Sequence, residues 1–103
     1  MTDDARIVDN SAEQRIELTV DGHLAFADYE LDGQRIVFTH TEVPEELQGQ
    51  GIGSTLVRGA LDLARERELE VIPSCPFVAN YVREHPAYLD LVSEQTRQRM
   101  QLN

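Results

Sequence analysis

The sequence predicts an α/β fold of the α+β kind: an antiparallel three-stranded meander followed by a helix, a parallel strand and one or two C-terminal helices. Two Asp-Gly pairs, Asp21-Gly22 and Asp32-Gly33, provide the positive-φ residues that tight hairpin turns need. Residues 48–54 hold three glycines and run into a helical pattern. Because a right-handed crossover joins parallel strands across a helix, the last strand is expected to lie parallel to its neighbour.

Alternation of apolar and polar residues defines the meander. Residues 15–20 form the first predicted strand, and Asp21-Gly22 turns the chain into the second, residues 23–31. Asp32-Gly33 repeats the turn before a third strand at residues 35–41. The first half of the chain is therefore expected to form one antiparallel sheet.

Helical spacing follows the glycines over residues 55–68. The apolar stripe expected to pack on the sheet comprises Ile52, Leu56, Val57, Ala60, Leu61, Leu63 and Ala64. Residues 70–73 then predict a fourth strand. Pro76 suits the first position of another helix that runs to about Glu84, where His85-Pro86 stops it. A last short helix is expected over residues 87–92 or beyond.

The ends of the chain are polar. Residues 1–14 and 96–103 show no sustained period, so we expect a frayed N-terminal tail and a polar C-terminal tail around one domain at residues 15–95. At 103 residues the chain has room for a modest core but for no separate substrate domain.

The charge of the chain limits its partners. Nine basic against 19 acidic residues give a formal net charge of −10, which would repel nucleic acid and anionic membranes. Every basic residue is an arginine, so a phosphate would have to be held by guanidinium groups or backbone amides. A small neutral or cationic partner fits this charge, although the acidity also fits a role in solubility alone.

Cysteine content and the N-terminal sequence predict a cytoplasmic protein. The single cysteine rules out an internal disulfide, which suits a reducing compartment. The first residues show neither the basic nor the apolar region of a secretory signal, and no stretch approaches the ~20 apolar residues of a membrane span. The three histidines and the cysteine have no ligand spacing, so we expect no metal site.

The glycine-rich turn predicts an anion site. Gly49, Gly51 and Gly53 allow close approach of the backbone, and the helix start that follows leaves N–H groups without intrahelical partners. Glycines before a helix are also ordinary loop residues, so this pattern alone is weak evidence. No Lys-Ser or Lys-Thr pair follows them, which argues against the P-loop of an NTPase, and no well-placed acidic residue completes a dinucleotide fingerprint.

The same turn resembles the acetyl-coenzyme A motif of the Gcn5-related N-acetyltransferases, Gln/Arg-x-x-Gly-x-Gly/Ala. Gln48, Gly51 and Gly53 match its three fixed positions, directly after an apolar strand. The resemblance covers roughly residues 24–91 and implies an acyl-CoA N-acyltransferase fold.

The chain is most similar to the short, single-domain branch of that superfamily. There Thr-Glu-Val-Pro precedes the loop, and a cysteine after the fourth strand is followed six residues later by a tyrosine. Here these are residues 41–44, Cys75 and Tyr81.

The resemblance implies a site for acetyl-coenzyme A. The diphosphate is expected on the N–H groups of residues 50–54, with Gln48 and Gly49 beside it, and the pantetheine arm along the backbone of Glu42 and Val43. The expected cofactor-binding residues are Glu42, Val43, Gln48, Gly49, Gln50, Gly51, Ile52, Gly53 and Ser54.

Cys75 and Tyr81 are candidate catalytic residues. As the N-cap before Pro76, Cys75 would lie where the helix dipole favours a thiolate, so it is a candidate nucleophile or acetyl-holding thiol. Most free cysteines are instead small buried apolar residues, and that alternative stays open. Tyr81 lies near the position at which many of these enzymes have a tyrosine that protonates the departing thiolate, but it would serve core packing equally well.

Glu42 and His40 are candidate general bases. Both lie at the end of the third strand, where alternation places them on one face, and either could take a proton from an ammonium group, directly or through water. Exposed residues at strand ends are also commonly structural. His23 and His85 are expected to be turn residues.

The favoured function is acetyl transfer from acetyl-coenzyme A to an unidentified amine, either by direct attack or through Cys75. Larger family members have two helices between their first strands, which build much of the acceptor site, and Asp21-Gly22 leaves no room for them. The acceptor site would then need a second subunit, as in a homodimer, or the partner's own surface. The alternatives are a non-catalytic CoA or acyl-CoA binding module and an acidic protein-interaction domain.

Overall fold

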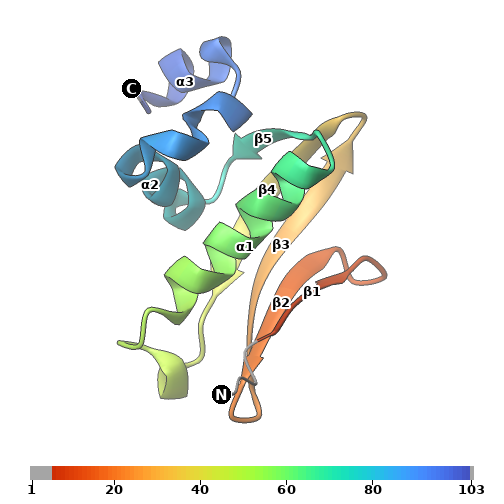
Figure 1. Ribbon diagram of the computed structural model, residues 1–103, viewed down its shortest axis with the longest axis vertical. Coiled ribbons are helices and arrows are strands. Elements are labelled where there is room, and N and C mark those ends of the chain that lie inside the picture. Colours follow the sequence, from red (N-terminus) through yellow and green to blue (C-terminus); the bar gives the residue numbers. More distant parts are fainter. Residues whose placement is uncertain (1–5, 103) are drawn as a thin grey trace.

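The computed structural model describes residues 6–102, which form one five-stranded sheet with helices packed against it (Figure 1). The strands follow chain order, β1 to β5. They are β1 (Arg6–Asn10), β2 (Arg15–Val20), β3 (His23–Asp32), β4 (Arg35–Glu42) and β5 (Glu70–Pro73). The antiparallel pairings β2–β3 and β3–β4 and the parallel pairing β4–β5 confirm the prediction. The antiparallel β1–β2 pairing was not predicted.

The helices comprise the 3-10 helix η1 (Glu45–Leu47), α1 (Ile52–Glu66), α2 (Pro76–Glu84), the 3-10 helix η2 (Pro86–Leu91) and α3 (Glu94–Met100). The three predicted helices are present with ends shifted by at most three residues, and two further helices, η1 and α3, were not predicted. Helix α1 starts three residues before the predicted position 55, so Gly53 lies in its first turn. Gly51 has φ +72° and is the N-cap, and this left-handed residue separates the turn from the helix.

Helix α1 crosses one face of the sheet and covers the core (Figure 1). Its buried residues Leu56, Val57, Ala60, Leu61 and Ala64 belong to the stripe predicted from the sequence. They pack on the strand residues of the same face, which are Ile16, Leu18, Ala25, Ala27, Tyr29, Ile36, Phe38 and Val71. Burial of both apolar faces against each other is the main stabilising contribution.

The predicted tails are wrong in local structure. Residues 1–5 lie outside the described part of the chain, but Arg6–Asn10 pairs with β2 as an additional edge strand. At the other end, where a polar tail was expected from residue 96, the chain forms α3 and buries Thr96 and Leu102. Both segments are too short and too polar to show a period, and tertiary contacts determine their structure.

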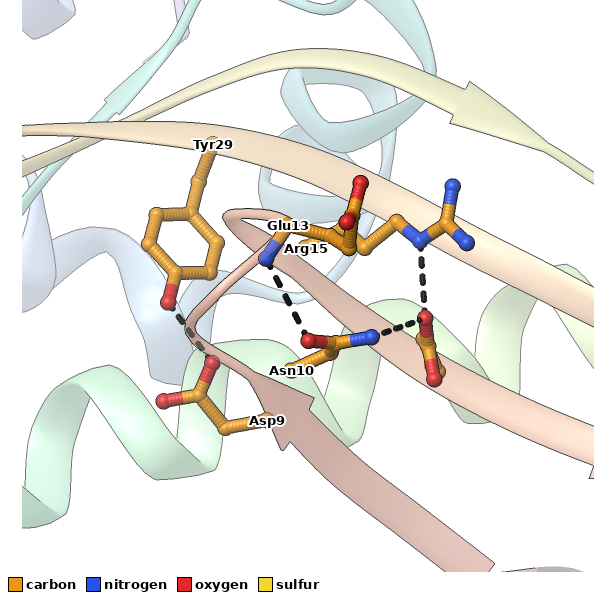
Figure 2. A network of polar contacts seen from close by, with 6 residues as sticks. Asp9, Asn10, Glu13, Arg15 and Tyr29 are labelled. Carbon is orange, nitrogen blue, oxygen red and sulfur yellow. Dashed lines mark hydrogen bonds and ion pairs between the residues drawn. The ribbon is translucent and has the colours of Figure 1, made fainter.

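A polar network ties β1 to the core (Figure 2). The buried Tyr29 hydroxyl donates a 2.6 Å hydrogen bond to the carboxylate of Asp9, which also accepts one of 2.7 Å from Arg67 of the loop after α1. Burial and the Asp9 contact raise the pKa of Tyr29 to about 12. The network joins the first strand, the third strand and the end of the helix.

Replacement of Tyr29 with Phe should lower the free energy of unfolding by about 2 kcal/mol, because a hydrogen bond to a buried charged group is lost. The matched control is Tyr88→Phe, which removes an exposed hydrogen bond to Asp62 and should cost less than about 1 kcal/mol. Denaturant unfolding measures both. The Tyr29 contribution should be present below pH 10 and disappear as the pH rises through about 12, since its folded-state pKa is raised. Equal losses in the two variants would contradict the role of Tyr29.

Candidate functional site

The glycine turn between β4 and α1 presents backbone N–H groups to solvent. Gly49 and Gly51 have φ of +83° and +72°, so both are left-handed. The first helical hydrogen bond is donated by the N–H of Thr55 to the carbonyl of Gly51. The amides of Ile52, Gly53 and Ser54 therefore have no intrahelical partner, and in the described chain no side chain caps this end. The positive end of the helix dipole lies at the turn.

A cleft of about 370 Å³ opens in front of this turn. It is lined by Thr41, Val43, Leu47, Gln48, Gly49, Gly51, Ile52, Gly53, Ser54 and Phe77, all uncharged. An anion in the cleft would therefore be held by amide dipoles rather than by side-chain cations, as a helix N-terminus permits. Gln48 shapes the turn by donating a 3.3 Å hydrogen bond to the carbonyl of Val43.

A β-bulge in β4 decides which side chains reach the cleft. His40 pairs with Asp28, whereas Phe38 pairs with Tyr29, so Thr39 is an additional residue on β4. Such an insertion reverses the side-chain alternation beyond it. Phe38 faces α1 before the bulge, and Thr41, paired with the buried Ala27, returns to that face after it.

His40 and Glu42 consequently lie on the opposite face of the sheet. Their side chains form a 3.0 Å hydrogen bond, and both are more than half exposed. The His40 ring lies 6.4 Å from that of Phe26 on the same face. The prediction that the two residues share a face agrees with this geometry, but neither lines the cleft.

One edge of β4 is free beside the cleft. Strand β5 pairs with β4 only as far as the Phe38–Pro73 pair, and the N–H of Cys75 donates to the carbonyl of Phe38. In the described structure β4 continues to Glu42 with a strand partner on the β3 side alone. An extended ligand could pair with this edge as an additional strand.

Cys75 lies behind the cleft rather than in it. It is the N-cap of α2, as predicted, with Pro76 at the first helical position, but only 4% of its surface is exposed. Its Sγ lies 3.3 Å from Oγ1 of Thr41, which does line the cleft. The threonine hydroxyl therefore separates the thiol from the space that a ligand would occupy.

Tyr81 lies across Phe77 from the cleft. It lines a second hollow of about 180 Å³ with Ser54, Phe77, Asn80 and Glu84. The Tyr81 ring stacks on His85 with centroids 3.9 Å apart, and its carbonyl contacts Nδ1 of that histidine. Its role as a proton donor stays a prediction, and so does its alternative role in packing.

The structure brings most of the predicted cofactor residues together. Seven of the nine line the cleft, namely Val43, Gln48, Gly49, Gly51, Ile52, Gly53 and Ser54. Glu42 and Gln50 do not: Glu42 faces the other side of the sheet, and the Gln50 side chain donates to the carbonyl of Glu46.

Sequence reasoning missed Thr41, Leu47 and Phe77 as lining residues. Thr41 depends on a bulge that has no sequence signal here. Phe77 has 42% of its surface exposed and directly follows Pro76. A large apolar residue in the first turn of a predicted helix is a signal from which a lining residue could have been predicted. The Phe77 ring rests on Gly53, where an added Cβ would lie 2.5 Å from Cζ.

Residues 6–102 hold no group of three or more histidine, cysteine or acidic side chains arranged to bind a metal ion. No helix among them is both long and apolar enough to cross a bilayer.

Comparison with known proteins assigns the geometry to a family. Residues 15–91 match the family described as GCN5-related N-acetyl-transferase. The NMR solution structure of a GCN5-like protein from Staphylococcus aureus is similar with a TM-score of 0.69 and 29% identity, and the match covers 89% of this chain and 91% of that one.

Sequence relatives include Protein NATD1 from several vertebrates. The Homo sapiens protein is 42% identical over 59 residues, which cover 56% of this chain and 52% of that protein. The Danio rerio protein is 36% identical over 67 residues, covering 62% and 61%. The chain thus spans about half the length of the human relative it matches.

The burial of Cys75 makes a direct prediction for its reactivity. With 4% of its surface exposed, the native thiol should react with a water-soluble aromatic disulfide at least ~10²-fold more slowly than in denaturant, because reaction requires local opening. The release of coloured thiol measures both rates on the single cysteine. A native rate equal to the denatured rate would contradict the geometry.

Proposed function

The chain belongs to the GCN5-related N-acetyltransferase family, and on this premise we propose that it transfers an acetyl group from acetyl-coenzyme A to a small or peptidyl amine. The observation that carries the proposal is the juxtaposition of an uncharged cleft, a helix start with free amides and a free strand edge. The free amides match the diphosphate of the acyl donor, and the free strand edge matches the amide groups of its pantetheine arm. The cleft residues thus fit the donor's chemistry.

The diphosphate would be held by the amides of Ile52, Gly53 and Ser54. These groups offer both hydrogen bonds and the positive end of the dipole, and with a formal net charge of −10 the chain has little long-range attraction for an anion. The pantetheine arm has amide groups that could pair with the free edge of β4 near Thr41 and Val43. Bound in this way, the donor supplies an activated thioester.

The amine would approach from the other face of the sheet. His40 and Glu42 lie there, beside the same strand segment whose opposite face lines the cleft. In this arrangement His40 accepts a proton from the ammonium group of the acceptor, which frees the neutral amine to attack, and Glu42 holds the imidazole by their 3.0 Å hydrogen bond. This face is accessible at the His40–Glu42 pair, because more than half of each side chain is exposed.

Direct attack of the amine on the thioester is favoured over a covalent relay through Cys75. A nucleophilic thiol must touch the carbonyl carbon, whereas Cys75 is 4% exposed and lies behind Thr41. The nitrogen forms the new bond to carbon, the carbon–sulfur bond breaks, and the thiol of coenzyme A leaves.

The proposal predicts thiol release when acetyl-coenzyme A is mixed with a panel of polyamines and lysine peptides. His40→Gln should lower kcat/KM by roughly 10²-fold, because the general base is removed. His23→Gln changes a histidine at the β2–β3 turn that neither lines the cleft nor forms the contact to Glu42, so it should leave kcat/KM within about twofold. Thiol release and the intact mass of the amine are the measurements.

Each other outcome of this experiment decides against a part of the proposal. Coenzyme A binding without turnover on any amine would identify a non-catalytic binding module. Absence of binding would favour a protein-interaction domain. An acetylated Cys75 seen in the intact mass of the protein would replace direct attack by a covalent route.

A substitution in the glycine turn should weaken coenzyme A binding, whereas a comparable glycine substitution elsewhere should lower stability alone. Gly51→Ala should weaken coenzyme A binding at least tenfold by calorimetry, because an L-residue at φ +72° relaxes and moves the amides that follow. The matched control is Gly33→Ala, at φ +60° in the remote β3–β4 turn. Each variant should lose about 1–2 kcal/mol of stability, and only the first should lose affinity. Unchanged affinity of Gly51→Ala would refute the site.

A further inference from the structure

Thr41 lines the cleft and also contacts the buried thiol. Its Oγ1 lies 3.3 Å from Sγ of Cys75, and the residue lines the cleft on the face reached through the bulge. A hydroxyl can accept one hydrogen bond and donate another at the same time. With the thiol donating to Oγ1, the hydroxyl proton of Thr41 is free to point into the cleft.

We infer that Thr41 is a catalytic residue that protonates the departing thiolate of coenzyme A, and that Cys75 acts through it as the proton source. The inference rests on the proposed function, because it concerns the leaving group of that reaction. It assigns to Thr41 the role predicted for Tyr81, which lies in a different hollow beyond Phe77.

The proton balance of the relay is complete. As the carbon–sulfur bond breaks, the electron pair on the leaving sulfur takes the proton of the Thr41 hydroxyl. Oγ1 takes the proton of the Cys75 thiol, which becomes a thiolate. After the product leaves, a proton from water in the cleft returns along the same path. The acceptor nitrogen loses two protons, one from the ammonium group before attack and one after the nitrogen–carbon bond forms. Both pass by way of His40 to solvent, so no other reactant is needed.

The surroundings of Cys75 suit a transient charge. The residue caps α2, and the first helical hydrogen bond is donated by the N–H of Ala79 to the carbonyl of Cys75. Within the described structure Sγ accepts no hydrogen bond from the N–H groups at this helix start, so the positive end of the helix dipole is what would stabilise a transient thiolate. Burial behind Thr41 keeps the thiol away from the thioester, so it can serve as an acid without becoming acetylated.

The test compares Thr41→Val, which keeps the shape and removes the hydroxyl, with Thr41→Ser, which keeps the hydroxyl. We expect kcat to fall about 10²-fold in the valine variant with KM for acetyl-coenzyme A within twofold, and to stay within twofold in the serine variant. Cys75→Ala should lower kcat equally, and the double variant no further, because the two residues act as one unit.

A readout independent of turnover is the infrared S–H stretching band, which arises from a single cysteine in this chain. It should have the frequency of a hydrogen-bonded thiol in the wild type and in Thr41→Ser, and shift to that of a free thiol in Thr41→Val. Calorimetry with coenzyme A and a thermal melt establish that each variant binds and folds.

Four outcomes would overturn the relay. These are wild-type kcat in Thr41→Val or Cys75→Ala, an equal fall in Thr41→Ser and Thr41→Val, multiplicative losses in the double variant, or an unshifted S–H band. If the wild-type protein releases thiol with none of the amines in the panel, the proposed function is wrong and the relay is wrong with it. An active wild type with unaffected variants overturns the relay alone.

Discussion

The additional residue at Thr39 in β4 is the constraint on which the arrangement of the site depends. Without it, strict alternation would place His40 and Glu42 on the same face as Phe38, beneath the helix, and Thr41 on the outer face. With it, Thr41 lines the cleft and the His40–Glu42 pair lies on the opposite face. One backbone irregularity thereby assigns the two kinds of chemistry to the two faces of one strand segment.

The second requirement is an anion site without cationic side chains. The chain is strongly acidic, and every residue that lines the cleft is uncharged. Left-handed glycines before α1 allow three amides to point outward at the positive end of the helix dipole. In the proposed function, a local, short-range site of this kind would hold an anion despite the unfavourable long-range field, because amide dipoles act at contact distance. The free edge of β4 then extends the site from the glycine turn toward Thr41.

Much of the fold could be predicted from the sequence because its signals are local. The Asp21-Gly22 and Asp32-Gly33 turns, the apolar stripe of α1 and Pro76 at the start of α2 each encode their structure within a few residues. The edge strand β1 and the helix α3 could not be predicted, because distant partners hold them: Asp9 depends on Tyr29 and Arg67, and Leu102 on the core. The candidate site shows the same contrast between local sequence signals and tertiary contacts. The glycine turn was found from its motif, whereas the positions of Thr41 and Glu42 depend on a bulge and were not.

The most direct test of this account is a titration of the ¹⁵N-labelled protein with coenzyme A, followed through the backbone amide signals. The account predicts the largest shifts at Ile52, Gly53 and Ser54 and at the free β4 edge from Thr41 to Val43, with small shifts on the outer face around Phe26. The account would be contradicted if the glycine-turn amides kept their positions while the protein bound the ligand elsewhere, or if the largest shifts lay on the outer face.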